Sequence, residues 1–138
     1  MKILILSFYY PPDIGPGPMR AEALVQSLSE KTKGRVSIDV VTTMPNRYKS
    51  HRQHALAYQK NGKVAITRFC LPEHKSGLFD QVAAFLVFAR KSLMITKKSE
   101  WDVVVATSGR LMTAWLGAFI SKRCGACLYL DIRDIFYE

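Results

Sequence analysis

Short runs of apolar residues recur along this chain and alternate with segments of helical spacing. Five runs have the length of strands: Ile3–Phe8, Val36–Thr43, Val64–Cys70, Val103–Thr107 and Ala126–Ile132. Apolar residues fill consecutive positions in these runs, rather than alternate ones, so each strand should be buried on both faces. This pattern is typical of a parallel sheet that is covered by helices on both sides.

Three helices are expected between the strands. The first has Pro18 in its opening turn and ends near Gly34, the second extends from Gly77 to about Lys98, and the third covers Leu111–Lys122. Right-handed crossovers then favour a doubly wound strand order of 3-2-1-4-5, with the first and fourth strands side by side. We therefore predict a Rossmann-like, three-layer α/β/α fold with a five-stranded parallel sheet.

The length and the ends of the chain favour one cytoplasmic domain. The 138 residues fit a single domain, 1–138. No segment reaches the ~18 uncharged apolar residues of a membrane span, and Met1-Lys2 leads directly into a strand without a cleavage site. Three cysteines give no disulfide framework.

Positive charge is concentrated in one third of the sequence. Residues 31–75 contain ten Lys/Arg and two acids, within a chain of net charge +9. A pyrophosphate-bearing substrate or an anionic membrane surface would suit this charge, and a merely solvated basic loop is the alternative. No nucleic-acid-binding motif accompanies it, so no nucleic acid partner is expected.

Ligands of doubly wound sheets bind beyond the carboxyl ends of the strands, at the point where the strand order reverses. Three segments should meet there: Tyr9–Arg20, Thr107–Arg110 and Asp131–Asp134. The functional site is expected to be built from these segments.

The first segment combines glycines with a helix start. Gly15, Pro16, Gly17 and Arg20 are its candidate substrate-binding residues. Glycine permits close approach of backbone to a ligand, and a helix N-terminus favours an anionic group such as a diphosphate. The spacing departs from the G-x-G-x-x-G pattern, and the second strand ends in threonines rather than an acid, which disfavours NAD. A stiff turn without a ligand is the alternative.

The other two segments carry polar side chains at strand ends. Ser108, Gly109 and Arg110 are further candidates for substrate binding, although Ser108 could simply cap the next helix. Charged residues at the end of an apolar strand are costly unless paired, which makes Asp131, Arg133 and Asp134 candidate catalytic residues. A structural Asp–Arg pair is the alternative.

No metal site is predicted. The spacing of His51 and His54 lacks the flanking ligands that a metal centre needs, and His74 lies in another loop.

Taken together, four motifs resemble the start of family 4 glycosyltransferases, in particular those of colanic-acid and O-antigen synthesis. The motifs are YYPPDIGPGPMR (9–20), TMPN (43–46), DVVVATS (102–108) and LDIRDIFYE (130–138). The chain departs from the family in its Gly-Pro-Gly loop and in Phe136-Tyr137, where relatives usually carry Trp-Pro.

The resemblance implies the N-terminal, acceptor-side half of a two-domain GT-B enzyme. Such an enzyme transfers a sugar from a nucleotide diphosphate sugar to a lipid-linked or glycan acceptor, with retention and usually without a metal or other cofactor. It also implies that the donor-binding C-terminal domain is absent from these 138 residues, so that the chain alone is inactive. Work at the cytoplasmic membrane face is a further expectation. A stand-alone Rossmann-like binding module without catalysis is the alternative.

Overall fold

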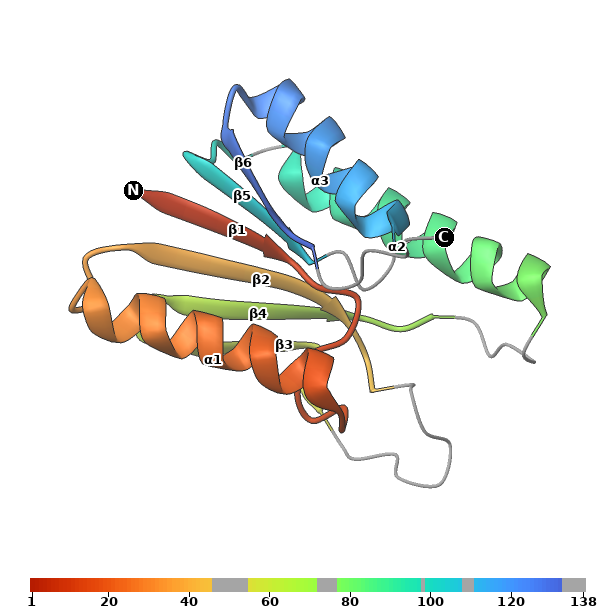
Figure 1. Ribbon diagram of the computed structural model, residues 1–138, viewed down its shortest axis with the longest axis horizontal. Helices are drawn as coiled ribbons and strands as arrows, with labels where there is room; N and C mark the ends of the chain where they lie inside the picture. Colours follow the sequence, from red (N-terminus) through yellow and green to blue (C-terminus); the bar gives the residue numbers. More distant parts are fainter. Residues whose placement is uncertain (46–54, 72–76, 98, 108–110, 133–138) are drawn as a thin grey trace.

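The computed structural model describes residues 1–45, 55–71, 77–97, 99–107 and 111–132. Within these residues the chain forms one six-stranded sheet of order β3-β4-β2-β1-β5-β6 with flanking helices (Figure 1). Along the sequence the elements are β1 (Lys2–Leu6), α1 (Pro16–Lys31), β2 (Ser37–Thr43), β3 (Tyr58–Asn61), β4 (Val64–Phe69), α2 (Leu78–Thr96), β5 (Val103–Thr107), α3 (Leu111–Cys124) and β6 (Cys127–Asp131).

The predicted order of the five apolar strands is confirmed. These strands are β4, β2, β1, β5 and β6, and all neighbours among them pair in parallel. The sheet is nevertheless mixed, because the sequence analysis missed β3, which pairs antiparallel with β4 across the turn at Asn61-Gly62. Tyr58–Asn61 is polar and exposed at all four positions, as an edge strand can be, and therefore lacks the apolar signal.

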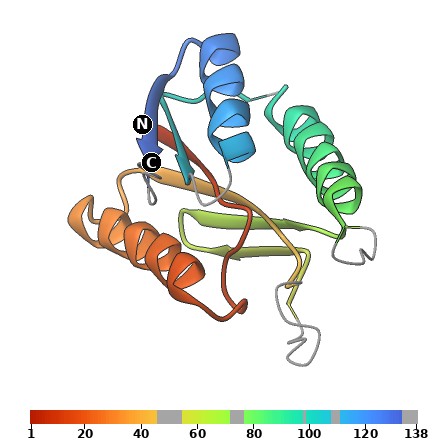
Figure 2. The ribbon, with the colours of Figure 1, turned by 45° about the vertical axis from the view of Figure 1, so that its right-hand side comes forward.

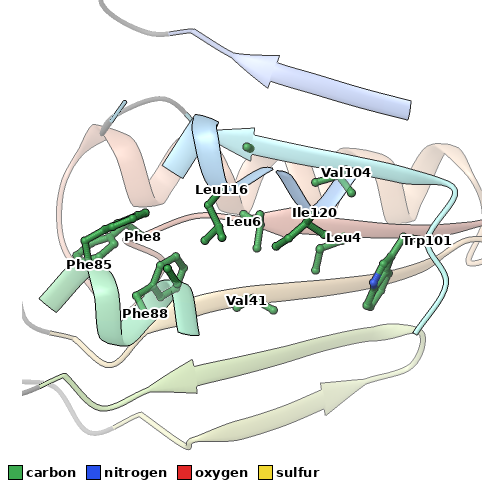
Figure 3. Close-up of a cluster of buried hydrophobic side chains, with 12 residues drawn as sticks. Leu4, Leu6, Phe8, Val41, Phe85, Phe88, Trp101, Val104, Leu116 and Ile120 are labelled. Atoms are coloured by element: carbon green, nitrogen blue, oxygen red, sulfur yellow. The ribbon is translucent and has the colours of Figure 1, made fainter. Parts of the chain in front are cut away.

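Helices cover both faces of the sheet, as expected for three layers. α1 lies on one face, and α2 and α3 lie on the other (Figures 1 and 2). Alternate residues of β1 point to opposite sides: Ile3 and Ile5 pack in the cluster under α1, whereas Leu4 and Leu6 pack in the cluster under α2 and α3. Figure 3 shows the second cluster, with Phe88 of α2 fully buried in it.

A glycine lets α3 approach the sheet closely. A Cβ atom added at Gly117 would lie 2.5 Å from the Cβ atom of Ala106 in β5. The backbone of α3 at Gly117 therefore packs directly against Ala106 of β5, next to the side chain of Leu128 in β6.

Two strands differ from the expectation of burial on both faces: β4 is half-buried at five of its six residues, and β6 is more exposed still. β6 is the edge of the described sheet, and four of its five residues are exposed. Its composition is that of an interior strand, but its outer edge has no neighbouring strand within the described residues.

The glycine loop lies between β1 and α1 and ends at Gly15, and Gly17 follows in the first turn of α1. β1 ends at Leu6, and α1 begins at Pro16, so that Pro18 lies in the first turn of the helix as expected. Residues 7–15 therefore form the connection at the carboxyl end of the central strand.

Candidate functional site

The carboxyl ends of four strands meet around the loop of residues 7–15. β1 pairs with β2 on one side and with β5 on the other, which is the expected reversal of strand order. In register, Leu6 lies beside Val41 and Ala106, and Thr107 lies beside Asp131. Thr107 also donates a hydrogen bond to the hydroxyl of Ser7, 3.2 Å away, and so links β5 to the start of the loop.

Hydrogen bonds fix the backbone of this loop. The four consecutive carbonyl oxygens of residues 8–11 all accept hydrogen bonds. The Phe8 carbonyl accepts from the hydroxyls of Thr43 at 2.8 Å and Thr42 at 3.4 Å. The next three accept, in order, from the hydroxyl of Ser7 at 2.7 Å, the amide of Asp13 at 3.1 Å and the guanidinium of Arg68 at 2.9 Å. The loop is therefore held by groups from β2, from the loop itself and from β4.

The two loop glycines differ in their backbone. Gly15 precedes α1 with φ 143° and ψ 168°, a conformation that is essentially restricted to glycine. Gly17 lies inside the first turn of α1, between Pro16 and Pro18. Because proline has no amide hydrogen, Gly17 carries the one N–H among the first three residues of the helix.

An ion pair joins two of the predicted segments. A guanidinium nitrogen of Arg20, in α1, lies 3.4 Å from a carboxylate oxygen of Asp131, at the end of β6. Arg20 is largely exposed, so we expect the pair to contribute no more than about 1 kcal/mol to stability. The contact brings the glycine loop and the end of β6 to the same side of the molecule.

The remaining predicted site residues lie outside the described part of the chain. These are Ser108, Gly109 and Arg110 after β5, and Arg133 and Asp134 after β6. Among the described residues, no three His, Cys, Asp or Glu side chains gather as a metal site requires.

Most of the described basic residues of region 31–75 lie away from the glycine loop, and Arg47, Lys49, Arg52 and Lys75 lie outside the described residues. Lys31, Lys33 and Arg35 lie at the end of α1 and just after it, and Lys60 and Lys63 flank the β3–β4 turn. These five residues therefore lie near the amino ends of β2 and β4, at the edge opposite the loop. Of the described Lys and Arg residues in the basic region, Arg68 contacts the loop.

The sequence analysis missed Arg68, although one signal was present. It interrupts the apolar strand β4, and its side chain is buried. Burial lowers the pKa of Arg68, but a guanidinium remains charged at any ordinary pH. Burial, reinforced by Glu22 and opposed by Arg68, raises the pKa of Tyr10 to about 12, so that this phenol is neutral at pH 7.

Comparison with solved structures identifies the same fold in proteins of different activity. The chain is similar to the C-terminal domain of PF1911 hydrogenase from Pyrococcus furiosus, with a TM-score of 0.57, 15% identity, and coverage of 95% of this chain and 90% of that chain. A second structure of that domain gives a TM-score of 0.59 at 16% identity, over 94% and 89% of the two chains.

A transferase is a further structural neighbour. A UGT transferase from Siraitia grosvenorii in complex with UDP matches with a TM-score of 0.53 and 16% identity. The match covers 94% of this chain but 27% of the transferase. At these identities the likeness shows the Rossmann-like α/β fold alone. No family model and no curated protein sequence matches the chain.

Proposed function

We propose that this chain is the acceptor-side domain of a glycosyltransferase that uses a nucleotide diphosphate sugar. The observation that carries the proposal is the fixed glycine loop at the carboxyl end of β1, in a fold that a UDP-bound transferase shares. A second, donor-binding domain completes the active site in this proposal. The family 4 resemblance supports a retaining transfer in surface polysaccharide synthesis.

In this proposal the loop contacts the diphosphate or the acceptor. The N–H of Gly17 is available for an anionic oxygen, and the backbone of Gly15 permits close approach. Asp134 or Asp131 orients an acceptor hydroxyl, and the family resemblance assigns Arg133 a role near the transferred sugar. Ser108, Gly109 and Arg110 add substrate contacts, whereas Arg20 holds Asp131 through the ion pair.

A stand-alone binding module is the second candidate. The observation behind it is the match to the C-terminal domain of a hydrogenase, of which the chain covers 90%, because the same fold occurs there outside a transferase. Both candidates place a ligand at the same loop, but only the first predicts sugar transfer.

Titration of the isotopically labelled chain with UDP tests the loop by NMR. We expect weak, millimolar binding, because half of the active site is missing, with shift changes at Gly15, Gly17, Thr107 and Asp131. The exposed turn at Gly62 serves as the internal control. Shift changes that avoid the loop, or none at saturating UDP, would leave the loop as a turn without a ligand.

We further propose a lipid-linked acceptor, reached from an anionic membrane surface. No helix in the described part of the chain is long and apolar enough to cross a bilayer. α2 and α3 nevertheless expose large apolar side chains on the face of the sheet that they share. This α2–α3 surface comprises Phe79, Val82, Leu86, Met94, Ile95, Leu111, Met112, Trp115 and Phe119.

The composition of these helices suits a charged bilayer. Trp115 and Phe119 stack with ring centroids 5.9 Å apart on α3, and aromatic rings are favoured at membrane interfaces. α2, its C-cap Lys97 and α3 contain five Lys/Arg and one acid, Asp80. Basic and apolar groups together favour reversible attachment to anionic lipid.

Sedimentation with phosphatidylglycerol vesicles tests this attachment. We expect the chain to pellet with the vesicles at low salt. It should be released at 1 M salt, where the electrostatic screening length falls to about 3 Å. Neutral phosphatidylcholine vesicles should retain less protein. Trp115→Ala should weaken binding several-fold, whereas Leu56→Ala, which removes an exposed apolar side chain elsewhere, should not. A chain that stays in the supernatant at low salt would favour a soluble acceptor.

A further inference from the structure

Arg68 is a buried cation near the end of β4. Its exposed fraction is 6%, and it stands between Thr67 and Phe69 in a strand whose other residues are mostly apolar. Moving a guanidinium out of water carries a large desolvation cost, which a neutral side chain would avoid. The hydrogen bonds of Arg68 must therefore offset the desolvation cost of its guanidinium.

The guanidinium joins two segments that are far apart in sequence. One terminal nitrogen donates to the carbonyl of Pro11 in the glycine loop, at 2.9 Å. The other donates to the carbonyl of Leu56 at 3.1 Å and to the side-chain oxygen of Gln59 at 3.4 Å. The planar guanidinium of arginine carries donors on both terminal nitrogens, so it can bond to both segments at once. A lysine ammonium does this less well.

The partners of this cation are neutral. They are two carbonyl oxygens and an amide oxygen, and the nearby phenol of Tyr10 keeps its proton at pH 7. None of the ion pairs formed among the described residues involves Arg68. The contact with Pro11 is thus a charge-assisted hydrogen bond to the loop backbone, a strong type of bond that does not depend on a carboxylate.

The position of Pro11 connects this bond to the ligand loop. Pro11 is the last of the four consecutive residues whose carbonyls are held, and Gly15 follows four residues later. The other side-chain donors, from Ser7, Thr42 and Thr43, hold the loop where it leaves β1. Arg68 therefore holds the part of the loop nearest to the glycines.

We propose that Arg68 is a positioning residue, which acts through the Pro11 carbonyl to hold the loop in the conformation that presents Gly15 and Gly17 to a ligand. This role rests on the proposed function of the loop and adds to it a residue that does not itself contact the substrate. Because Arg68 holds the loop before the ligand arrives, the loop loses less conformational freedom on binding. The affinity for the ligand therefore increases.

Amide hydrogen exchange in the 138-residue chain tests the proposal directly. The Asp13 amide, bonded to the Tyr10 carbonyl, reports on the loop, and the Ile38 amide, bonded to the Lys63 carbonyl, reports on the sheet. In Arg68→Gln we expect at least tenfold faster exchange at Asp13, with Ile38 unchanged within about twofold. Arg68→Lys, which keeps the charge, should restore part of the protection. Arg90→Gln, at an exposed position on α2, is the matched control and should change neither amide.

Two results would overturn this role. One is unchanged exchange at Asp13 in Arg68→Gln. The other is equal acceleration at Asp13 and Ile38 in both variants, which would make Arg68 a residue of the fold alone. Arg68→Lys decides the question if Arg68→Gln fails to fold.

A UDP titration of the same variants separates the two proposals. We expect Arg68→Gln to bind UDP at least tenfold more weakly than the wild type, with a partial return in Arg68→Lys. Equal affinity in wild type and Arg68→Gln would contradict the positioning role. If the wild type itself does not bind UDP, the proposed function fails, while exchange at Asp13 still decides whether Arg68 holds the loop.

Discussion

Phe88→Ala is expected to destabilise the domain by about 3–5 kcal/mol, the usual cost of removing a buried phenylalanine side chain. The ring of Phe88 is fully buried between α2 and the sheet, with edge contacts to Phe8 at 5.2 Å and Phe69 at 6.2 Å between ring centroids (Figure 3). Typical domains have a total stability of about 5–15 kcal/mol, so the variant should be close to unfolded. Urea denaturation followed by circular dichroism measures the loss.

Phe79→Ala, on the same helix, is the matched control. The side chain of Phe79 is 90% exposed, so its removal should change stability by less than about 0.5 kcal/mol. A large loss of stability in Phe79→Ala, or a small loss in Phe88→Ala, would contradict this packing. It would mean that the face of α2 that carries Phe79 packs on the sheet.

The two loop glycines should respond differently to valine. Gly15→Val should cost about 1–3 kcal/mol, because a β-branched residue is strained at φ 143° and ψ 168°. Gly17→Val should leave stability within about 1 kcal/mol of the wild type, because Gly17 has a helical backbone, where the higher helix propensity of valine offsets the steric cost of a Cβ atom before Pro18. Thermal denaturation of both variants measures the difference.

Ligand binding completes this comparison. We expect Gly17→Val to lose the UDP-induced shift changes although its fold is intact, since the side chain would cover the N–H of the first helical turn. Unchanged UDP affinity in Gly17→Val would show that the ligand does not approach the loop there. Equal destabilisation by the two substitutions would contradict the backbone difference between the glycines.

The fold was predictable because the three central strands of this sheet are mostly buried on both faces. Consecutive apolar residues in β1, β2 and β5 identify such strands directly. β3 could not be predicted in this way, because an exposed edge strand held by backbone hydrogen bonds needs no apolar residue. The edge position of β6 could not be predicted either, because its apolar composition is that of an interior strand.

The layout of the candidate site was predictable where chain topology alone determines it. Parallel strands bring the glycine loop and Asp131 to one edge, and Arg20 and Asp131 do meet there. The identity of the side chains that donate hydrogen bonds to the loop depends on their direction and length. The spacing of residues along the sequence does not determine these. Arg68 was the detectable exception, because a charge within an apolar strand is costly unless it is paired.

The central claim is that this domain supplies one half of a sugar-transferring active site, and a transfer assay tests it most directly. Radiolabelled nucleotide sugars are offered, with a lipid-linked acceptor, to the purified 138-residue chain and to a gene product that joins this domain to a donor-binding domain. Stabilisation of the transition state needs groups on both sides of the transferred sugar. We predict no transfer by the chain alone and measurable transfer by the joined product. Transfer by the chain alone, or a joined product that binds the nucleotide sugar and transfers nothing, would contradict the account.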